Sequence, residues 1–374
     1  MDPSNERNWE EFQVRSVSLG LKEETTFPSL FILPAQCLGL GLLTFGTRPL
    51  NCALLLLQLM LVHFFTLALA EACRKQHQYT LPGVVEAALG ERWRHAMECV
   101  LIAYTFSTMV LAQLLLSTAL ITALLDVGVV SEGDTNWWHV VTAVGICVLS
   151  GLASCYTTVS SMGTSALVAC ALSLFALFVQ VLQWSSNTHS QDYKVDFNLL
   201  SLHSVHAMSL SMSWAWLFPF LQAEKQYSAL SLTNAASWTL GGLFVPAIFI
   251  LPNTRVDYNV VTPGSWFAPV YKLALLPSLV LVSAFSLYVC RMTTKQLIGG
   301  VKVFKSPILY YGLTVMFSFC AAILLAAIPE VIPQLLFTQV VGFFVVTFVA
   351  PAVLAGMQWM YCGVAFEVVL LLLD

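Results

Sequence analysis

Long apolar segments, separated by short polar stretches, recur along almost the whole chain. Each is about 20 residues long, the length that a helix needs to cross the hydrocarbon core of a bilayer. Ten of them are expected to cross, at about residues 28–49, 53–72, 95–125, 137–155, 160–184, 199–221, 232–251, 266–290, 307–328 and 335–358. A shorter one at 361–373 contains Glu367 and is marginal for a full crossing. The sequence therefore predicts an all-α, multi-pass protein with 10–11 transmembrane helices.

The composition agrees with a lipid environment and excludes several functions. Of the 374 residues, 58% are hydrophobic and 10% are charged, whereas soluble domains carry roughly 25% charge. A net charge of −4 gives no basic surface for nucleic acid. The ten cysteines are scattered singly, without the spacing of a zinc site or a disulfide framework. No nucleophile–base pair, phosphate loop or metal cluster is recognisable, so we expect neither an enzyme nor a bound metal.

Lysine and arginine predict the orientation, because cytoplasmic loops carry an excess of these residues. With the N-terminus in the cytoplasm, twelve of the sixteen fall on the inner side. The four on the outer side are Arg48, Lys194, Arg255 and Lys272. We therefore expect an integral protein of the plasma membrane or of a lysosomal or endosomal membrane, with its N-terminus in the cytoplasm.

The first apolar segment contains three glycines within eight residues, at Gly39, Gly41 and Gly46, between Pro34 and Pro49. Glycine costs a helix interior about 1 kcal/mol relative to alanine. Transporters use interrupted membrane helices to bind substrate and coupling ion near the midplane. The alternative interpretation is that these glycines allow neighbouring helices to pack closely. We expect a break in this helix.

The sixth segment is unusual for a different reason. It brings hydroxyls, bulky aromatic rings and a proline to membrane depth, in the order Ser209-Leu-Ser211-Met-Ser213-Trp214-Ala-Trp216-Leu-Phe218-Pro219. Proline removes a backbone hydrogen bond and kinks the helix before it. This predicts a second broken helix.

The two interrupted segments stand five apart, which is the spacing expected of two inverted repeats of five helices. The predicted organisation is a cytoplasmic tail at 1–26, a first repeat at 27–184, a second repeat at 199–358 and a short last helix at 359–374. The two halves share no clear sequence identity, so the repeat is inferred from the breaks.

Several motifs resemble the amino acid/auxin permease family, and most closely its sodium-coupled neutral amino acid transporters. Residues 30–45 resemble the first helix of that family, around its L-G-x-G motif. Further likenesses follow in the family's order, at residues 79–90, 104–108, 283–290 and 328–332. The resemblance extends from about Phe27 to Gln358. It implies a five-plus-five helix fold and secondary transport of a small, neutral amino acid by alternating access.

Substrate-binding residues are expected on both broken helices. Freed N–H groups in helix one suit the substrate carboxylate, because half-helix N-termini attract anions. Carbonyls in helix six, with a serine hydroxyl, suit the ammonium group, and the two tryptophans shape the pocket. The expected set is Gln36, Gly39, Leu40, Gly41, Ser211, Met212, Ser213, Trp214 and Trp216.

The sodium site implied by the resemblance is incomplete. The family's asparagine and threonine ligands fall on Ala35 and Val282, which have no side-chain oxygen. Sodium needs hard oxygen ligands, so Ser283 and main-chain carbonyls would form only a weak site. No cofactor is expected beyond a coupling ion, H⁺ or Na⁺. A non-transporting amino-acid sensor, or an inactive paralogue with the same fold, is the alternative function.

Two further polar residues, His63 and Gln113, lie at membrane depth. Intramembrane ionisable groups are candidates for function, and His63 is a weak candidate for a proton carrier. A hydrogen bond to a neighbouring helix is the simpler expectation for both.

The charge distribution gives a testable topology. The N-terminus and the loop containing Lys302 should be accessible from the cytoplasm, and the Ser185–Asn198 loop from outside. Single accessible cysteines or tags at these three places, labelled with an impermeant reagent in intact and permeabilised cells, measure this. Labelling at Lys302 in intact cells would reverse the assignment.

Overall fold

The computed structural model describes residues 30–45, 52–76, 78, 80–131, 135–155, 159–186, 209, 212–219, 221, 234, 267–298, 307–327, 331–356, 360–365 and 368. Within these residues the chain forms helices and turns, without a strand. The helices are α2 (Ile32–Phe45), α3 (Cys52–Gln76), α4 (Leu81–Leu89), α5 (Glu91–Asp126), α6 (Thr135–Ala153), α7 (Gly163–Ser186), α11 (Phe267–Ile298), α13 (Pro307–Ala327), α14 (Ile332–Phe344) and α15 (Ala350–Ala355).

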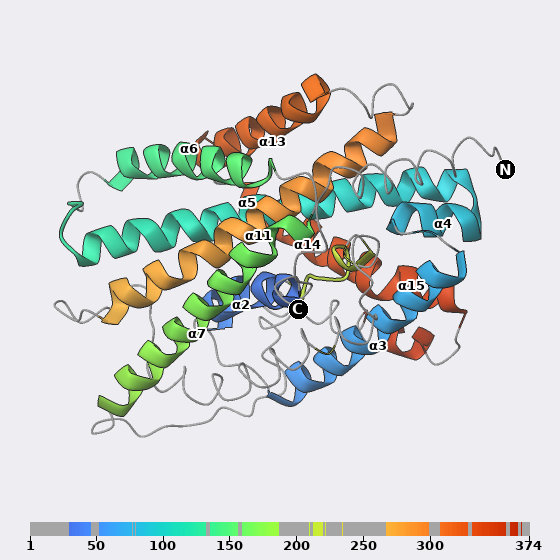
Figure 1. Cartoon of the computed structure of the whole chain (residues 1–374), viewed down its shortest axis with the longest axis horizontal. Helices are drawn as coiled ribbons and strands as arrows, with labels where there is room; N and C mark the ends of the chain where they lie inside the picture. Colours follow the sequence, from blue (N-terminus) through green and yellow to red (C-terminus); the bar gives the residue numbers. More distant parts are fainter. Residues whose placement is uncertain are drawn as a thin grey trace.

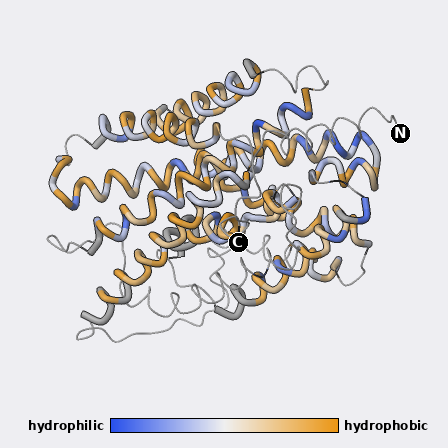
Figure 2. The backbone as a smooth tube through the Cα atoms, in the orientation of Figure 1, coloured by the Kyte–Doolittle hydropathy of each residue, from blue (hydrophilic) through white to orange (hydrophobic). Residues whose placement is uncertain are grey.

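The described helices have the length and composition of a membrane protein. Four spans are long and apolar enough to cross a bilayer: Glu91–Asp126, Pro269–Ile298, Leu309–Ala326 and Ile332–Ala355. Three more apolar helical stretches are shorter, at Leu57–Cys73, Trp137–Ala153 and Gly163–Val179. Hydrophobic residues dominate the helices along most of their length (Figure 2). The all-α membrane class is confirmed, while the total of 10–11 crossings stays a prediction, because the segment at 232–251 lies almost wholly outside the described residues.

Helices α5 and α11 form the centre of the bundle and cross it side by side in opposite directions (Figure 1). At one end, Lys272 Nζ of α11 donates to Asp126 Oδ2 of α5 at 2.8 Å. Helices α6 and α13 pack against each other and against this pair. On the other side, α7 and α2 contact α11, while α14 contacts α5.

The outward sides of α6 and α13 are apolar. Large hydrophobic side chains are exposed along both helices, including Val144, Val148, Leu152, Val315 and Phe319. An exposed apolar surface of this extent is unusual in soluble monomers. It is the surface that lipid covers in a membrane protein.

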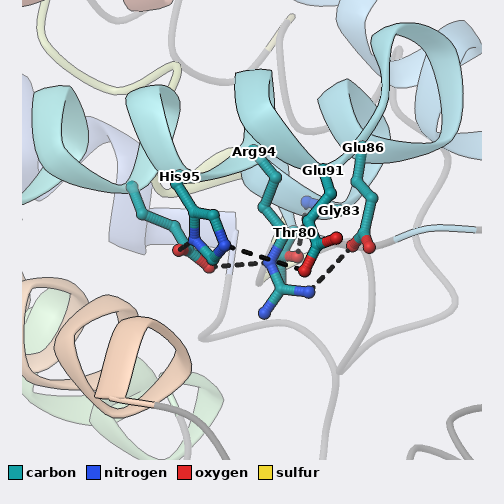
Figure 3. Close-up of polar contacts among 7 residues, drawn as sticks. Thr80, Gly83, Glu86, Glu91, Arg94 and His95 are labelled. Carbon is teal, nitrogen blue, oxygen red and sulfur yellow. Dashed lines mark hydrogen bonds and ion pairs between the residues drawn. The ribbon is translucent and has the colours of Figure 1, made fainter.

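A short helix, α4, is capped at its own N-terminus and joined to the start of α5 by an ion pair (Figure 3). Thr80 Oγ1 accepts a hydrogen bond from the Gly83 amide at 3.2 Å, which satisfies one free N–H of the first turn. Gly90, with φ of 95°, then turns the chain into α5. Arg94 donates to Glu86 at 3.0 Å and to the buried Glu98 at 2.9 Å. The Arg94–Glu86 ion pair holds α4 against α5.

The break expected in helix one at Gly39–Gly41 is wrong. Helix α2 runs without interruption from Ile32 to Phe45, so the amides of Gly39, Leu40 and Gly41 belong to the helix. Two glycines cost the helix about 2 kcal/mol. Each backbone group left unpaired inside a membrane protein costs several kcal/mol. Unwinding would therefore cost more than the two glycines do, and the segment stays helical. Pro34 lies in the first turn of α2, where its missing N–H has no helical partner to lose.

The break expected in helix six is confirmed. Residues Met212–Leu217 form turns rather than helix, between helical residues at Ser209 and Phe218. The Trp214 amide bonds the Met212 carbonyl at 2.9 Å, and the Leu217 amide bonds the Trp214 carbonyl at 2.9 Å. Neither is the i→i−4 bond of an α-helix. Pro219 explains part of the break, because it cannot donate to the Ala215 carbonyl.

A π-helix at Val345–Val349 (η5) joins α14 to α15. Pro351 lies in the first turn of α15. In a regular α-helix its ring would clash with the carbonyl four residues earlier, at Thr347. The wider π turn accommodates the proline without ending the helix. Phe348, on this turn, stacks edge-to-face on Phe65 of α3 with ring centroids 5.0 Å apart.

Candidate functional site

The non-helical turn Met212–Leu217 lies in the interior of the bundle, and Figure 1 draws it near the centre of the view. All six of its residues are buried. Inside a membrane protein, irregular backbone persists only where protein or a water-filled cavity surrounds it. The turn is therefore the natural starting point for a binding site.

Helix α2 reaches the turn through Gln36. Its Nε2 donates to the Ser213 carbonyl at 3.4 Å, across 177 residues of sequence. This bond fixes which way the amide points, so Oε1 is left as a buried acceptor. Within the part of the chain that the structure describes, Gln36 Oε1 has no hydrogen-bond partner.

Helix α5 contributes Tyr104. Its phenol faces Ser213 and Trp216, but it makes no hydrogen bond of normal geometry with the described residues. The indole N–H of Trp216 is likewise buried without a partner among them. One acceptor, on Gln36, and two potential donors, on Tyr104 and Trp216, thus lack a hydrogen-bond partner of normal geometry within the part of the chain that the structure describes.

Helices α3 and α14 bond to Trp214 within the turn and to Ser209 before it. Trp214 Nε1 donates to Thr66 Oγ1 of α3 at 3.4 Å. Ser209 Oγ, before the turn, donates to Gln339 Oε1 of α14 at 3.0 Å. The turn is therefore fixed by contacts with α2, α3, α5 and α14.

Tyr104 itself is held by an unusually close approach of α14. A Cβ atom built on Gly342 would lie 2.5 Å from Tyr104 Cβ and 2.7 Å from its Cγ. Such distances are far inside van der Waals contact, so only glycine fits at position 342. Because Gly342 has no side chain, α14 can approach Tyr104 this closely and keep it next to the turn.

The structure brings together five of the predicted binding residues: Gln36, Met212, Ser213, Trp214 and Trp216. Ser211 lies outside the described residues. The side chains at 39–41 also lie outside them, although their backbone is helical.

Ser283, the predicted ion ligand, is engaged in a hydrogen-bond chain. It accepts from Gln113 Nε2 of α5 at 3.0 Å, and Cys147 of α6 donates to Gln113 Oε1 at 3.4 Å. Gln113 is therefore bonded to neighbouring helices, as expected from its depth. Ala35 and Val282 are fully buried. No cluster of three metal-ligating side chains occurs among the described residues.

Sequence reasoning missed four residues that hold or line the site: Thr66, Tyr104, Gln339 and Gly342. Tyr104 belongs to one of the motifs that resemble permeases, which was the signal available for it. For Thr66, Gln339 and Gly342, nothing in the sequence pattern indicated a role.

Comparison of the whole sequence with family models and with curated proteins finds no match. The resemblance to amino acid/auxin permeases therefore rests on its motifs.

Replacing Gly342 with alanine should move Tyr104. The new methyl group overpacks the α5–α14 contact, which we expect to destabilise the protein by about 1–3 kcal/mol and to weaken ligand binding. The matched control is Gly312→Ala in α13, where a Cβ meets nothing within 4 Å. There the change should be neutral or slightly stabilising. Thermal unfolding of the purified protein measures both, and equal midpoints for the two variants would contradict the close-contact argument.

Proposed function

We propose that the chain is a secondary transporter of small, neutral amino acids that works by alternating access. The observation that carries this proposal is the set of unused polar atoms around the buried turn. Gln36 Oε1 can accept from an ammonium group, while Tyr104 OH and Trp216 Nε1 can donate to a carboxylate. A free amino acid supplies both groups on adjacent atoms. The Met212 and Ser213 carbonyls each already accept one hydrogen bond, and each has a second lone pair that can accept from the ammonium group.

The helix contacts support the inverted-repeat part of this proposal. If helices 1–5 correspond to 6–10, then α5 corresponds to α11, α6 to α13 and α7 to α14–α15. The contacts then occur in equivalent pairs: α5–α6 with α11–α13, α6–α11 with α13–α5, and α7–α11 with α14–α5. The α2–α7 contact has its counterpart in the bond from Ser209 to Gln339 of α14. This pairing, and the opposite directions of α5 and α11, are what an inverted repeat requires.

A non-transporting amino-acid sensor is the second candidate. Two observations favour it: helix α2 is continuous where a transporter helix is expected to open, and Ser283 is already bonded to Gln113. A sensor would bind the amino acid at the same turn without moving it.

Uptake of a labelled amino-acid panel into proteoliposomes tests the proposal. Tyr104→Phe should lower the apparent affinity about 10- to 100-fold, because a hydrogen bond to a charged group contributes about 1.5–3 kcal/mol. The control is Tyr311→Phe on the lipid-facing side of α13, which is half exposed and should leave uptake unchanged. Saturable binding without uptake would favour the sensor. Binding of no amino acid, or equal effects of the two variants, would contradict the site.

Transport should not depend on sodium. Ala35 and Val282 supply no side-chain oxygen, the helical carbonyls of α2 are bonded within the helix, and Ser283 is held by Gln113. These groups cannot surround a hard cation. Replacing external sodium with choline at constant pH should leave the initial rate of uptake unchanged. A steep loss of uptake in choline would refute this view of the ion site.

A further inference from the structure

Arg291 of α11 is fully buried at the junction of α6, α11 and α13. Its guanidinium donates to Thr314 Oγ1 at 2.7 Å, to the Ser154 carbonyl at 2.9 Å and to the Tyr310 hydroxyl. It also lies 3.6 Å from the centroid of the Tyr310 ring. All of these partners are neutral, so none balances the charge.

No described carboxylate is available to do so. The described residues contain five, and each has a cation or histidine elsewhere as its partner: Glu71, Glu86, Glu91, Glu98 and Asp126. An isolated charge in a low-dielectric interior is strongly destabilising. Buried charges inside membrane bundles are accordingly rare and commonly functional.

Unused hydrogen-bond donors accompany this charge. Arg291 Nε is buried without a partner among the described residues, and so are the hydroxyls of Ser150 and Ser318. Ser150 lies one turn before Ser154 on α6, and Ser318 lies one turn after Thr314 on α13. Each serine therefore lies one helical turn from a residue that is bonded to the guanidinium. Ser318 Oγ also lies close to α6, since a Cβ built on Gly151 would be 3.3 Å from it.

We propose that this junction binds a small monovalent anion, of which chloride is the type, through Arg291 Nε with help from the serine hydroxyls. A carboxylate or phosphate ester normally takes two parallel N–H groups of an arginine, and here the guanidinium nitrogens on the fork are already bonded. Two N–H groups remain, one on Nε and one on Nη1. Because both N–H groups of Nη2 are used, no parallel pair is free, and this, together with the complete burial, suits a monatomic ion. The bound anion neutralises the charge and holds α6 and α13 against α11.

The test is the thermal unfolding midpoint of the full chain in detergent, with chloride titrated against gluconate at constant pH and ionic strength. The midpoint should rise by a few degrees and saturate with chloride, because a ligand that binds only the folded state stabilises it in this way. Arg291→Met should abolish the chloride dependence. The unfolding midpoint of this variant should lie further below that of the unmodified protein in chloride than in gluconate. Lys75→Met, which removes an exposed cation of α3, should retain the full dependence.

If Arg291→Met does not fold, Ser318→Ala provides the milder variant and should shift the chloride titration to higher concentration. A midpoint that is equal in chloride and gluconate would overturn the proposal. So would an Arg291→Met deficit that is the same in both salts, since this is the result expected if another part of the chain balances the charge. The test requires no transport activity and is therefore independent of the proposed function.

Discussion

The antiparallel contact between α5 and α11 is the interaction on which the rest of the bundle depends. Between helices in lipid the hydrophobic effect contributes little, so packing and interhelical hydrogen bonds determine how helices associate. This pair has polar contacts at two levels: Asp126 with Lys272 at one end, and Gln113 with Ser283 within the membrane. They fix the register of the two helices. Helices α2, α6, α7, α13 and α14 each pack against one or both of them.

The candidate site follows from that arrangement. A non-helical turn inside a membrane is tolerated only when protein satisfies its backbone and side chains. Here Gln36, Thr66 and Gln339 reach the turn region from three helices, and Tyr104 lies against it from α5. The site is thus a product of packing between segments that are far apart in sequence, and a few of its buried polar atoms have no hydrogen-bond partner among the described residues.

Sequence reasoning located the helices well and the contacts poorly, for physical reasons. Hydrophobic length predicts a membrane helix almost by itself, and α6 and α13 begin and end close to the expected residues. Pro219 has no N–H to donate to the Ala215 carbonyl, so an irregular turn before it was predictable. Glycine is only a weak helix breaker, so Gly39 and Gly41 could not decide between unwinding and packing. The role of Gly342 depends on Tyr104, which is 238 positions away in the chain, and no local pattern encodes such a contact.

The π-helix between α14 and α15 has a consequence for the directions in which their side chains point. A π turn accommodates one residue more than an α turn, so the angular phase of the helix shifts by about 100° across it. Helix α14, before the shift, packs against α5, while α15, after it, packs against α3. One continuous helix thereby presents two surfaces to two neighbours that do not lie on the same side of it. The extra residue sets the angle between the two packed surfaces. Deleting one residue from Val345–Val349 would therefore turn α15 away from its neighbour, whereas a substitution there would leave that angle unchanged.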